Sequence, residues 1–319
     1  MRVDVLALDG VFDLGLAAVL DAFQTANELA EASGLRAPRF EVRVAGLRRR
    51  VTTAQGLKVP VRSEAARAPD CVVVPAIGAK MPGVLEAALA RPDVADAAAW
   101  LRERQAAGAL MSAACIGTFV LAESGLLDGR EATTTWWLAP LFRRRYPGVR
   151  LDEGRMIVAS GRTVTAGAAL GHMDLALWLV RESSPRLAAL TAKYLIVDAR
   201  PSQSAYALTD HLAHADDVVL GFERWARAHL RRGFALDEAA RAVGASKRTL
   251  ARRLQRVLGL SPLAYFQRVR VQQAVHLLKT TGATVDDVAA RVGYSNAATL
   301  RTLLRRRLDA GVKDIRRRA

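Results

Sequence analysis

The chain has 319 residues, of which 51% are apolar and 24% charged, and these values exclude a disordered chain and leave room for two domains. Its two cysteines, Cys71 and Cys115, exclude a disulfide-stapled scaffold and favour a reducing compartment. The net charge of +16 lies entirely in residues 224–319, which hold 22 Lys and Arg against 6 Asp and Glu, and this basic module predicts a polyanion as partner.

Residues 1–190 alternate strand-like and helix-like segments. This alternation predicts an open, mostly parallel α/β sheet with helices on both faces, in which ligands bind at the carboxyl ends of the strands. Acidic residues interrupt the apolar N-terminus, so we expect no secretory signal and a cytoplasmic protein. The predicted strands cover 3–8, 40–46, 71–75, 109–114 and 157–167, and the predicted helices include 16–30, 94–107 and 118–125.

The stretch 105–122 carries no charge and is long enough to suggest a membrane span. Gly108, Ser112, Gly117 and Thr118 interrupt it, however. A buried strand followed by a buried helix explains the stretch better, and no membrane association is expected.

Cys115 follows the predicted strand 109–114 in the small-residue turn SAACIGT. A nucleophile is mounted in this way at a strand-to-helix turn, but a thiol needs a base or a positive field to be active at neutral pH. His172 is considered as that base, although a lone histidine that opens a helix is more often a packing or capping residue. The other histidines form no metal-binding spacing with the cysteines, and no cofactor or metal is expected.

The segment ACIGTFVLAESGLLDGREATT resembles the ThiJ/PfpI branch of the class I glutamine-amidotransferase-like fold, and the resemblance covers residues 3–179. It implies an elbow cysteine at Cys115, a histidine at position 135 and an acid in the first loop. This chain has Thr135 instead of the histidine, and the acid position falls on Gly15, with Asp13 out of register. Cys115 and Thr135 therefore form a pseudo-site that is not catalytic. The candidate ligand contacts around it are Cys115, Ile116, Ile77 and Trp136, with Trp136 and Trp137 alternatively in the core.

Two segments of the basic module repeat one pattern, LDEAARAVGASKRTLARRLQRV from Leu236 and VDDVAARVGYSNAATLRTLLRRR from Val285. Each has a short helix closed by Val-Gly, then a small polar cap and a second helix. Gly permits the left-handed turn, and Ser246 and Asn296 are the caps. These are two helix-turn-helix units, and residues 262–278 are predicted to form one long helix between them. The expected buried stripes are Leu250, Leu254 and Leu258 in the first unit and Leu300, Leu304 and Leu308 in the second.

The arrangement over residues 234–317 resembles the AraC/XylS family of transcription regulators. The last stretch, AGVKDIRRR, departs from the family pattern and leaves the packing of the final helix open. The motif RPSQSAY at 200–206 and the order of the domains resemble the GlxA-type group of that family. The predicted division is therefore a sensor domain over 1–190, a linker over 191–223 and a DNA-binding domain over 224–319.

In such units the second helix enters the major groove of DNA with its exposed side chains. We expect Arg248 and Arg252 to read bases, Lys247 and Arg256 to touch phosphates, and Arg305, Arg306 and Arg307 to be backbone contacts or solvated charge. The full predicted set is Lys247, Arg248, Ala251, Arg252 and Gln255 in the first unit and Ala298, Thr299, Arg301 and Thr302 in the second.

The sequence thus predicts a transcription regulator that binds double-stranded DNA, with a non-catalytic amidotransferase-like domain that senses a small-molecule effector and forms a homodimer. A ThiJ/PfpI-type hydrolase or hydratase that uses Cys115 is the alternative, and the absent histidine argues against it. A nonspecific nucleoid protein is disfavoured because two capped recognition helices imply a defined geometry in the groove.

Overall fold

A computed structural model describes residues 1–62, 67–198, 202–203, 216–308 and 311–317 of the chain. The chain forms two compact units, the first unit Met1–Gln203 and the second unit Ser204–Ala319. The predicted linker, 191–223, includes the end of the last helix of the first unit and the start of the first helix of the second. Of the motif at 200–206, the described residues keep Ser202 and Gln203.

A six-stranded sheet forms the centre of the first unit, in the order β2-β1-β5-β6-β10-β9. All neighbours in it are parallel except β9 and β10, which form an antiparallel hairpin. The predicted open, mostly parallel sheet is therefore confirmed. Its strands are β1 (Arg2–Leu6), β2 (Glu41–Ala45), β5 (Cys71–Val74), β6 (Leu110–Ala114), β9 (Ile157–Ser160) and β10 (Thr163–Ala166).

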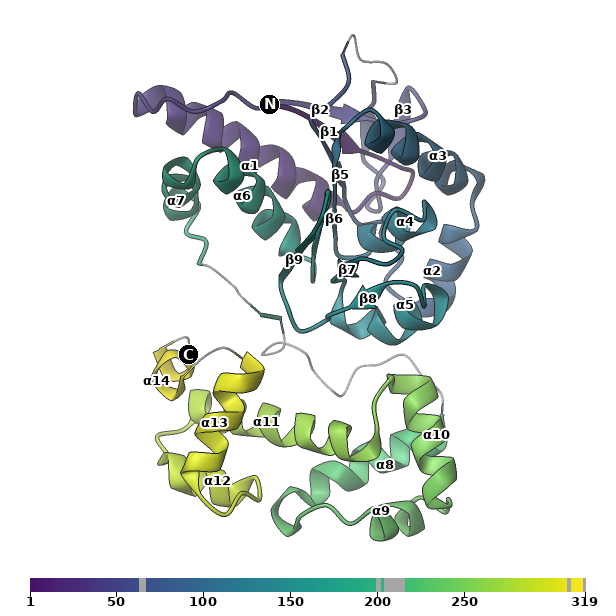
Figure 1. Ribbon diagram of the computed structural model, residues 1–319, viewed down its shortest axis with the longest axis vertical. Coiled ribbons are helices and arrows are strands. Elements are labelled where there is room, and N and C mark those ends of the chain that lie inside the picture. Colours follow the sequence, from purple (N-terminus) through teal and green to yellow (C-terminus); the bar gives the residue numbers. More distant parts are fainter. Residues whose placement is uncertain (63–66, 199–201, 204–215, 309–310, 318–319) are drawn as a thin grey trace. The chain divides into compact units, whose positions relative to one another are not determined.

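Helices cover both faces of this sheet, which Figure 1 shows nearly edge-on. Because successive side chains of a strand point to opposite faces, Cys71 and Val73 of β5 belong to one hydrophobic core and Val72 and Val74 to the other. One face carries α1 (Asp13–Ala32), α6 (Gly171–Ser183) and α7 (Pro185–Tyr194), and the other carries α2 (Pro82–Leu89), α3 (Pro92–Ala106), α4 (Gly117–Glu123) and α5 (Ala139–Arg145).

Short elements that the sequence pattern did not predict fill the remaining loops of the first unit. β3 (Arg50–Thr52) and β4 (Lys58–Pro60) form an antiparallel pair, and β7 (Glu131–Ala132) pairs in parallel with β8 (Arg150–Leu151). A 3-10 turn, η1 (Trp136–Leu138), precedes α5. The uncharged stretch 105–122 contains the end of α3, then β6 and α4, and no helix among the described residues is long and apolar enough to cross a membrane.

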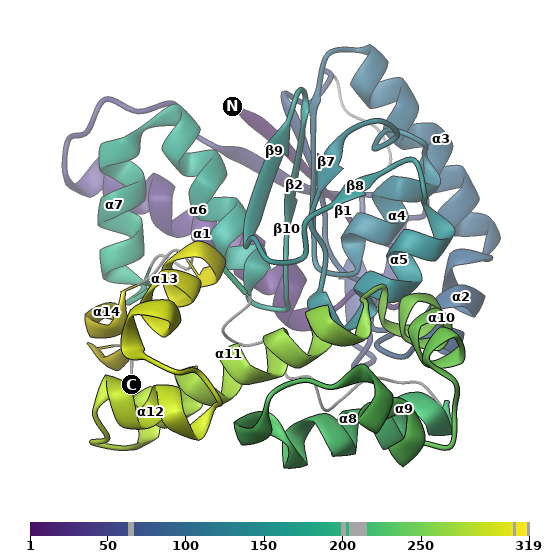
Figure 2. The same cartoon turned by 60° about the horizontal axis from the view of Figure 1, so that its bottom comes forward.

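The second unit is helical, and its long helix α11 (Pro262–Thr280) connects two helix-turn-helix units. Figures 1 and 2 show α10 and α13 at opposite ends of α11. The other elements are α8 (Asp217–Ala228), η2 (Leu230–Arg232), α9 (Leu236–Ala242), α10 (Lys247–Leu258), α12 (Val285–Arg291), α13 (Ala297–Leu308) and α14 (Val312–Arg317).

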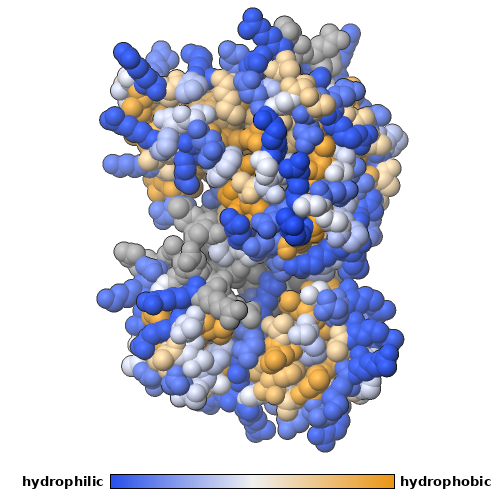
Figure 3. Space-filling model, viewed as in Figure 1, coloured by the Kyte–Doolittle hydropathy of each residue, from blue (hydrophilic) through white to orange (hydrophobic). Residues whose placement is uncertain are grey.

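Two hydrophobic cores share α11, because its first half faces one core and its second half faces the other. Phe266 packs with α8, α9 and α10, and Ala274 packs with α12 and α13. The final helix α14 packs in this second core through Ile315, which answers the question that its unusual sequence left open. Most of the surface of this unit visible in Figure 3 is hydrophilic, with apolar side chains gathered over α8 and α11.

Candidate functional site

Cys115 lies at a strained turn between β6 and α4. Its φ of 57° is in the left-handed region, which non-glycine residues rarely adopt. The turn is also tight, since a Cβ on Gly117 would lie 2.2 Å from the carbonyl oxygen of Val74. This is the geometry by which a strand-to-helix elbow presents a nucleophile.

The thiol in this elbow is nevertheless buried and protonated. Cys115 is 3% exposed, and burial raises the pKa of its thiol to about 12. The Thr135 hydroxyl and the Lys80 ammonium lower that pKa only in part. Thr135 itself is fully buried, and its hydroxyl has no hydrogen-bond partner of normal geometry among the described residues. Thr135 therefore does not supply the base that the elbow lacks.

His172, at the start of α6, is held by backbone groups on both sides of its ring. Nε2 accepts a hydrogen bond of 3.0 Å from the Ala76 amide, so Nδ1 carries the proton and donates to the Ala169 carbonyl at 2.6 Å. Burial lowers the pKa of His172 to about 4. With both nitrogens engaged, this neutral imidazole ties two loops together and cannot accept a proton from a thiol.

The same ring occupies the space next to Gly15. A Cβ at position 15 would lie 2.6 Å from Nε2 of His172, which is closer than any real contact. The predicted acid position is therefore filled by another side chain. Asp13 does not replace the acid, because one carboxylate oxygen accepts from the Gln55 amide at 3.0 Å.

The predicted ligand contacts fall into a buried group and one accessible residue. Ile77, Cys115 and Ile116 are all at most 3% exposed and belong to a single hydrophobic core. Trp136 is half-buried and packs edge-to-face against Trp137, with ring centroids 5.6 Å apart. Trp137 packs on that core and donates to the Lys80 carbonyl at 3.3 Å.

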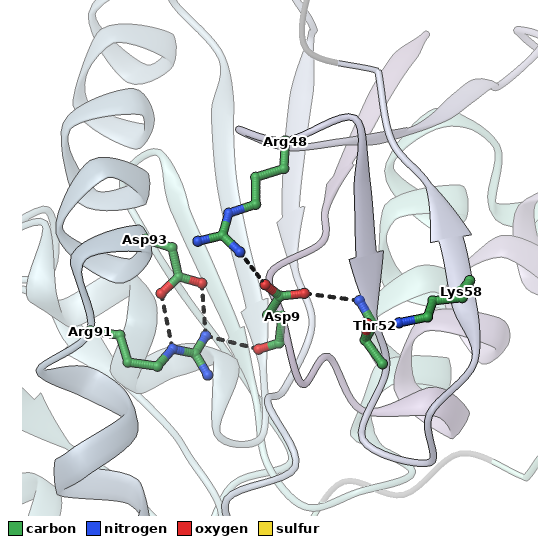
Figure 4. A network of polar contacts seen from close by, with 6 residues as sticks. All are labelled: Asp9, Arg48, Thr52, Lys58, Arg91 and Asp93. Atoms are coloured by element: carbon green, nitrogen blue, oxygen red, sulfur yellow. Dashed lines mark hydrogen bonds and ion pairs between the residues drawn. The ribbon is translucent and has the colours of Figure 1, made fainter.

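A polar network fixes the loop that follows β1 (Figure 4). The Asp9 carboxylate accepts from Arg48 at 2.5 Å and from the Thr52 amide at 2.9 Å, while its carbonyl accepts from Arg91 at 2.8 Å. Arg91 in turn forms two 2.9 Å hydrogen bonds with Asp93. Because the amide of Gly78 donates to Gly10 in the same loop, this network also braces the segment that contains Ile77.

The two helix-turn-helix units have the local geometry that the repeat predicts. Gly244 and Gly293 have φ values of +63° and +81° in the turns. The Ser246 side chain caps α10 by accepting from the Thr249 amide, and Asn296 accepts from the Thr299 amide at the start of α13. The buried stripes Leu250, Leu254, Leu258 and Leu300, Leu304 are also present, while the side chain of Leu308 lies outside the described residues.

The predicted contact residues lie mainly on the exposed faces of α10 and α13. Ala251 is half-buried, and Lys247 forms a 2.8 Å ion pair with Asp237 of α9. The Thr299 hydroxyl bonds to Asn296 at 3.0 Å. The side chains of Arg306 and Arg307 lie outside the described residues. Those that are exposed are Lys247, Arg248, Arg252, Gln255, Ala298, Thr299, Arg301 and Thr302.

Arg270 of α11 joins the two helix-turn-helix units, and the sequence pattern did not reveal it. Its guanidinium is buried and donates to the Leu230 carbonyl through Nε at 3.2 Å and Nη2 at 2.8 Å. Phe266 and Tyr294 lie against the guanidinium, with ring centroids at 4.7 and 5.2 Å. A Cβ on Gly293 would lie 2.1 Å from the same Leu230 carbonyl, so glycine is needed there for packing as well as for the turn. The available signal was a charged residue on the apolar side of a long helix.

No group of three or more His, Cys, Asp or Glu residues suited to a metal ion occurs in the described ranges.

Comparison with known proteins assigns both parts of the chain. Residues 1–182 match the DJ-1/PfpI family, and residues 239–318 match a helix-turn-helix domain. The transcriptional regulator GbdR of Pseudomonas aeruginosa is 27% identical over 301 residues, which cover 91% of this chain and 77% of that protein. The transcriptional regulator CdhR of the same species is 26% identical over 66% of this chain and 64% of its own length. The transcriptional activator RhaS of Klebsiella pneumoniae is 34% identical over 38% of this chain and 42% of its own length.

Solved structures match the first unit. A protein of Vibrio parahaemolyticus described as a transcriptional regulator has 22% identity and a TM-score of 0.51, over 61% of this chain and 98% of its own. An AraC family regulator from Pseudomonas putida has 23% identity and a TM-score of 0.49 over the same shares. The narrower GlxA-type grouping stays a prediction. The chain belongs to the DJ-1/PfpI family through its first unit and, with its AraC-type helix-turn-helix domain, to the AraC-family transcription regulators that carry such a unit.

Proposed function

We propose that this regulator recognises specific DNA sequences with the exposed faces of α10 and α13, and that its first unit senses an effector without catalysing a reaction. The observation that carries the DNA-reading role is the pair Arg248 and Arg252, both exposed on a capped helix above a buried leucine stripe. Arg can bond guanine through two hydrogen bonds in the major groove. Residue contacts at α13 are shorter, so apolar contact with thymine methyl groups is expected there.

Selection of genomic fragments by the full-length protein tests this role. The fragments are incubated with the protein at fixed salt, the bound ones are sequenced, and the enriched site is compared with scrambled DNA. We expect the site to bind about a thousandfold or more tightly than scrambled DNA. Retention of fragments without sequence preference would instead identify a nonspecific nucleoid protein.

The non-catalytic role of the elbow is supported by three features together: the protonated thiol, the engaged His172 ring and the filled space at Gly15. We expect iodoacetamide to modify Cys115 more slowly in the native protein than in a short cysteine peptide at neutral pH. Cys115→Ser should keep full DNA binding. The enzyme alternative predicts turnover of ester, amide or carbonyl substrates that disappears in Cys115→Ser, and such turnover would overturn the proposal.

The first unit is also proposed to form a homodimer, because two-fold pairing matches a protein that reads two half-sites. Sedimentation equilibrium of the full chain tests this. A mass of one chain at micromolar concentration, with and without the selected DNA, would contradict it. For an effector, Trp136 is the accessible contact among the predicted set, so Trp136→Phe should change effector affinity while leaving DNA affinity unaltered.

A further inference from the structure

The side chain of Gln203, the last residue of the first unit, is fully buried in that unit. Its amide nitrogen lies 2.8 Å from the Thr134 carbonyl, 3.2 Å from the Thr133 hydroxyl and 3.4 Å from the Arg155 carbonyl. The backbone beside it is attached as well, because the Gln203 amide donates to the Gly154 carbonyl at 3.1 Å and the Ser202 hydroxyl to the same carbonyl at 2.7 Å. A residue at the junction of the two units is thus held as firmly as a core residue.

Gly167 makes room for this side chain. A Cβ at position 167 would lie 2.1 Å from the Gln203 amide nitrogen. The φ of Gly167 is not in the left-handed region, so the backbone there does not require glycine. Space for Gln203 is the reason that the structure gives for this glycine.

The groups that hold Gln203 also hold the elbow. The Thr134 hydroxyl donates to the Cys115 carbonyl at 2.7 Å, and the carbonyl of the same Thr134 accepts from Gln203. On the other side, the Cys115 amide donates to Ala166, which immediately precedes Gly167. Two short paths of contacts therefore lead from the Cys115 peptide to Gln203.

The far end of the same connection is attached to the first recognition helix. Asp216 caps α8 and forms ion pairs with Arg253 at 3.0 Å and Arg256 at 3.6 Å, both on α10. Burial works to raise the pKa of Asp216, but Arg253 and the amides of α8 outweigh it and hold that pKa below its usual value. The chain that leaves Gln203 thus enters the second unit at a residue bound to α10.

We propose that Gln203 is a latch by which the elbow region sets how tightly the two units are tethered. While Gln203 is held, the tether between the attachment points is residues 204–215. When the contacts with Thr134 are lost, the segment after α7, from 195 onward, joins the tether and lengthens it. This inference rests on the proposed function, in which the second unit binds DNA and the first unit responds to an effector.

Distances between fluorescent labels on the two units of the full chain test the latch. Glu103→Cys on α3 and Glu238→Cys on α9 give exposed labelling sites, while Cys71 and Cys115 are buried. Gln203→Ala removes the latch, and Gly167→Ala expels the Gln203 side chain without changing it. We expect both variants to broaden the single-molecule distance distribution by a similar amount. Because Gly167→Ala acts through Gln203, adding it to Gln203→Ala should cause no further broadening.

Thr134→Val tests the path to the elbow, since it keeps the shape of the side chain and removes the hydroxyl bound to the Cys115 carbonyl. It should broaden the distribution in the same direction. The matched controls are Gln24→Ala, an exposed glutamine on α1, and Gly83→Ala, a glycine of α2 with open space around it. Neither control should change the distribution. Melting curves show whether each variant is folded.

An unchanged distribution in folded Gln203→Ala and Gly167→Ala would overturn the latch. The same labelled proteins are also titrated with the selected DNA. Failure of the wild type to bind specific DNA counts against the proposed function and leaves the distance result intact, so the two failures are distinguishable.

Discussion

Gly15 and His172 form a matched pair, because the histidine ring occupies the volume that any larger residue at position 15 would need. We expect Gly15→Ala to destabilise the protein by about 1–3 kcal/mol, the usual range for overpacking a core. Denaturant unfolding measures this, with Gly83→Ala as the control that meets open space. In a His172→Ala background the cost of Gly15→Ala should largely vanish, and an equal cost in both backgrounds would show that the ring is not the obstacle.

The buried imidazole also makes stability depend on pH. The pKa of His172 is about 4 in the folded protein against 6.5 for an ordinary histidine, so between these values the unfolded chain binds a proton that the native state does not. The stabilisation is complete above pH 6.5 and is lost as the pH falls towards 4, with a total of about 3 kcal/mol. The difference in unfolding free energy between wild type and His172→Gln, measured from pH 7 to 4, isolates this group from the carboxylates. A difference that stays constant over this range would contradict the assignment.

The sequence indicated some of these residues and not others, for a physical reason. Cys115, Thr135 and Gly15 stand at motif positions, so each could be named before the structure. The contact between His172 and Gly15 joins segments far apart in the chain, and no local pattern encodes it. Gln203 and Arg270 look like ordinary polar residues until their burial is known.

At the scale of elements, α10 and α13 are expected to play different parts in binding. Arg252→Ala removes an exposed side chain opposite the Leu250–Leu254 stripe, so the melting temperature should stay near that of wild type. Affinity for the selected site should fall by about 1–3 kcal/mol, with relaxed selectivity at one base pair. Arg305→Ala, late in α13, should weaken binding to all DNA alike. Titrating both variants on selected and scrambled DNA at one salt concentration decides the matter, since equal losses on both DNAs for Arg252→Ala would make it a phosphate contact.

The spacing of these two helices depends on α11 and its Arg270. Arg270→Gln should leave the Leu230 carbonyl with a weaker partner and destabilise the protein by about 1–3 kcal/mol. If Arg270 also fixes the separation of the helix-turn-helix units, the variant should tolerate a one-base-pair insertion between the two contacted boxes better than wild type does. Arg270→Lys keeps the charge but not the planar stacking on Phe266 and Tyr294, so it should behave like Arg270→Gln. Unchanged spacing preference in both variants, despite lower stability, would limit Arg270 to a role in folding.

Element prediction succeeded where a pattern was long. The strands of the sheet and the caps, turns and long helix of the second unit all follow from periodicity and turn chemistry. The β3–β4 pair has three residues per strand, too few to establish alternation, and it depends on the loop around Asp9 instead. The start of α8 fell in the predicted linker because its apolar side, Val219 and Phe222, is only recognisable as such once its packing partners are known.

For the whole molecule, the separation of charge predicts a steep response to salt. Residues 224–319 carry the whole net charge of +16. With six to ten phosphate contacts, counterion release implies a loss of about a thousandfold or more in affinity between roughly 50 and 200 mM salt. Fluorescence anisotropy of the full chain on labelled DNA over this range gives the slope. A nearly flat response would show that the excess charge does not face the phosphates.

The pairing of Gly15 with His172 also bears on how this chain can evolve. An ancestor with an acid at position 15 could not have had the present ring in its present place, because the two side chains claim one volume. Once the glycine and the histidine are both fixed, a mutation that restores the acid meets a clash, and a mutation that removes the histidine leaves a hole and an Ala76 amide without its acceptor. Either single step lowers fitness before the other can compensate. The loss of catalysis in this lineage is therefore protected against reversal by packing alone, whatever selection later favours.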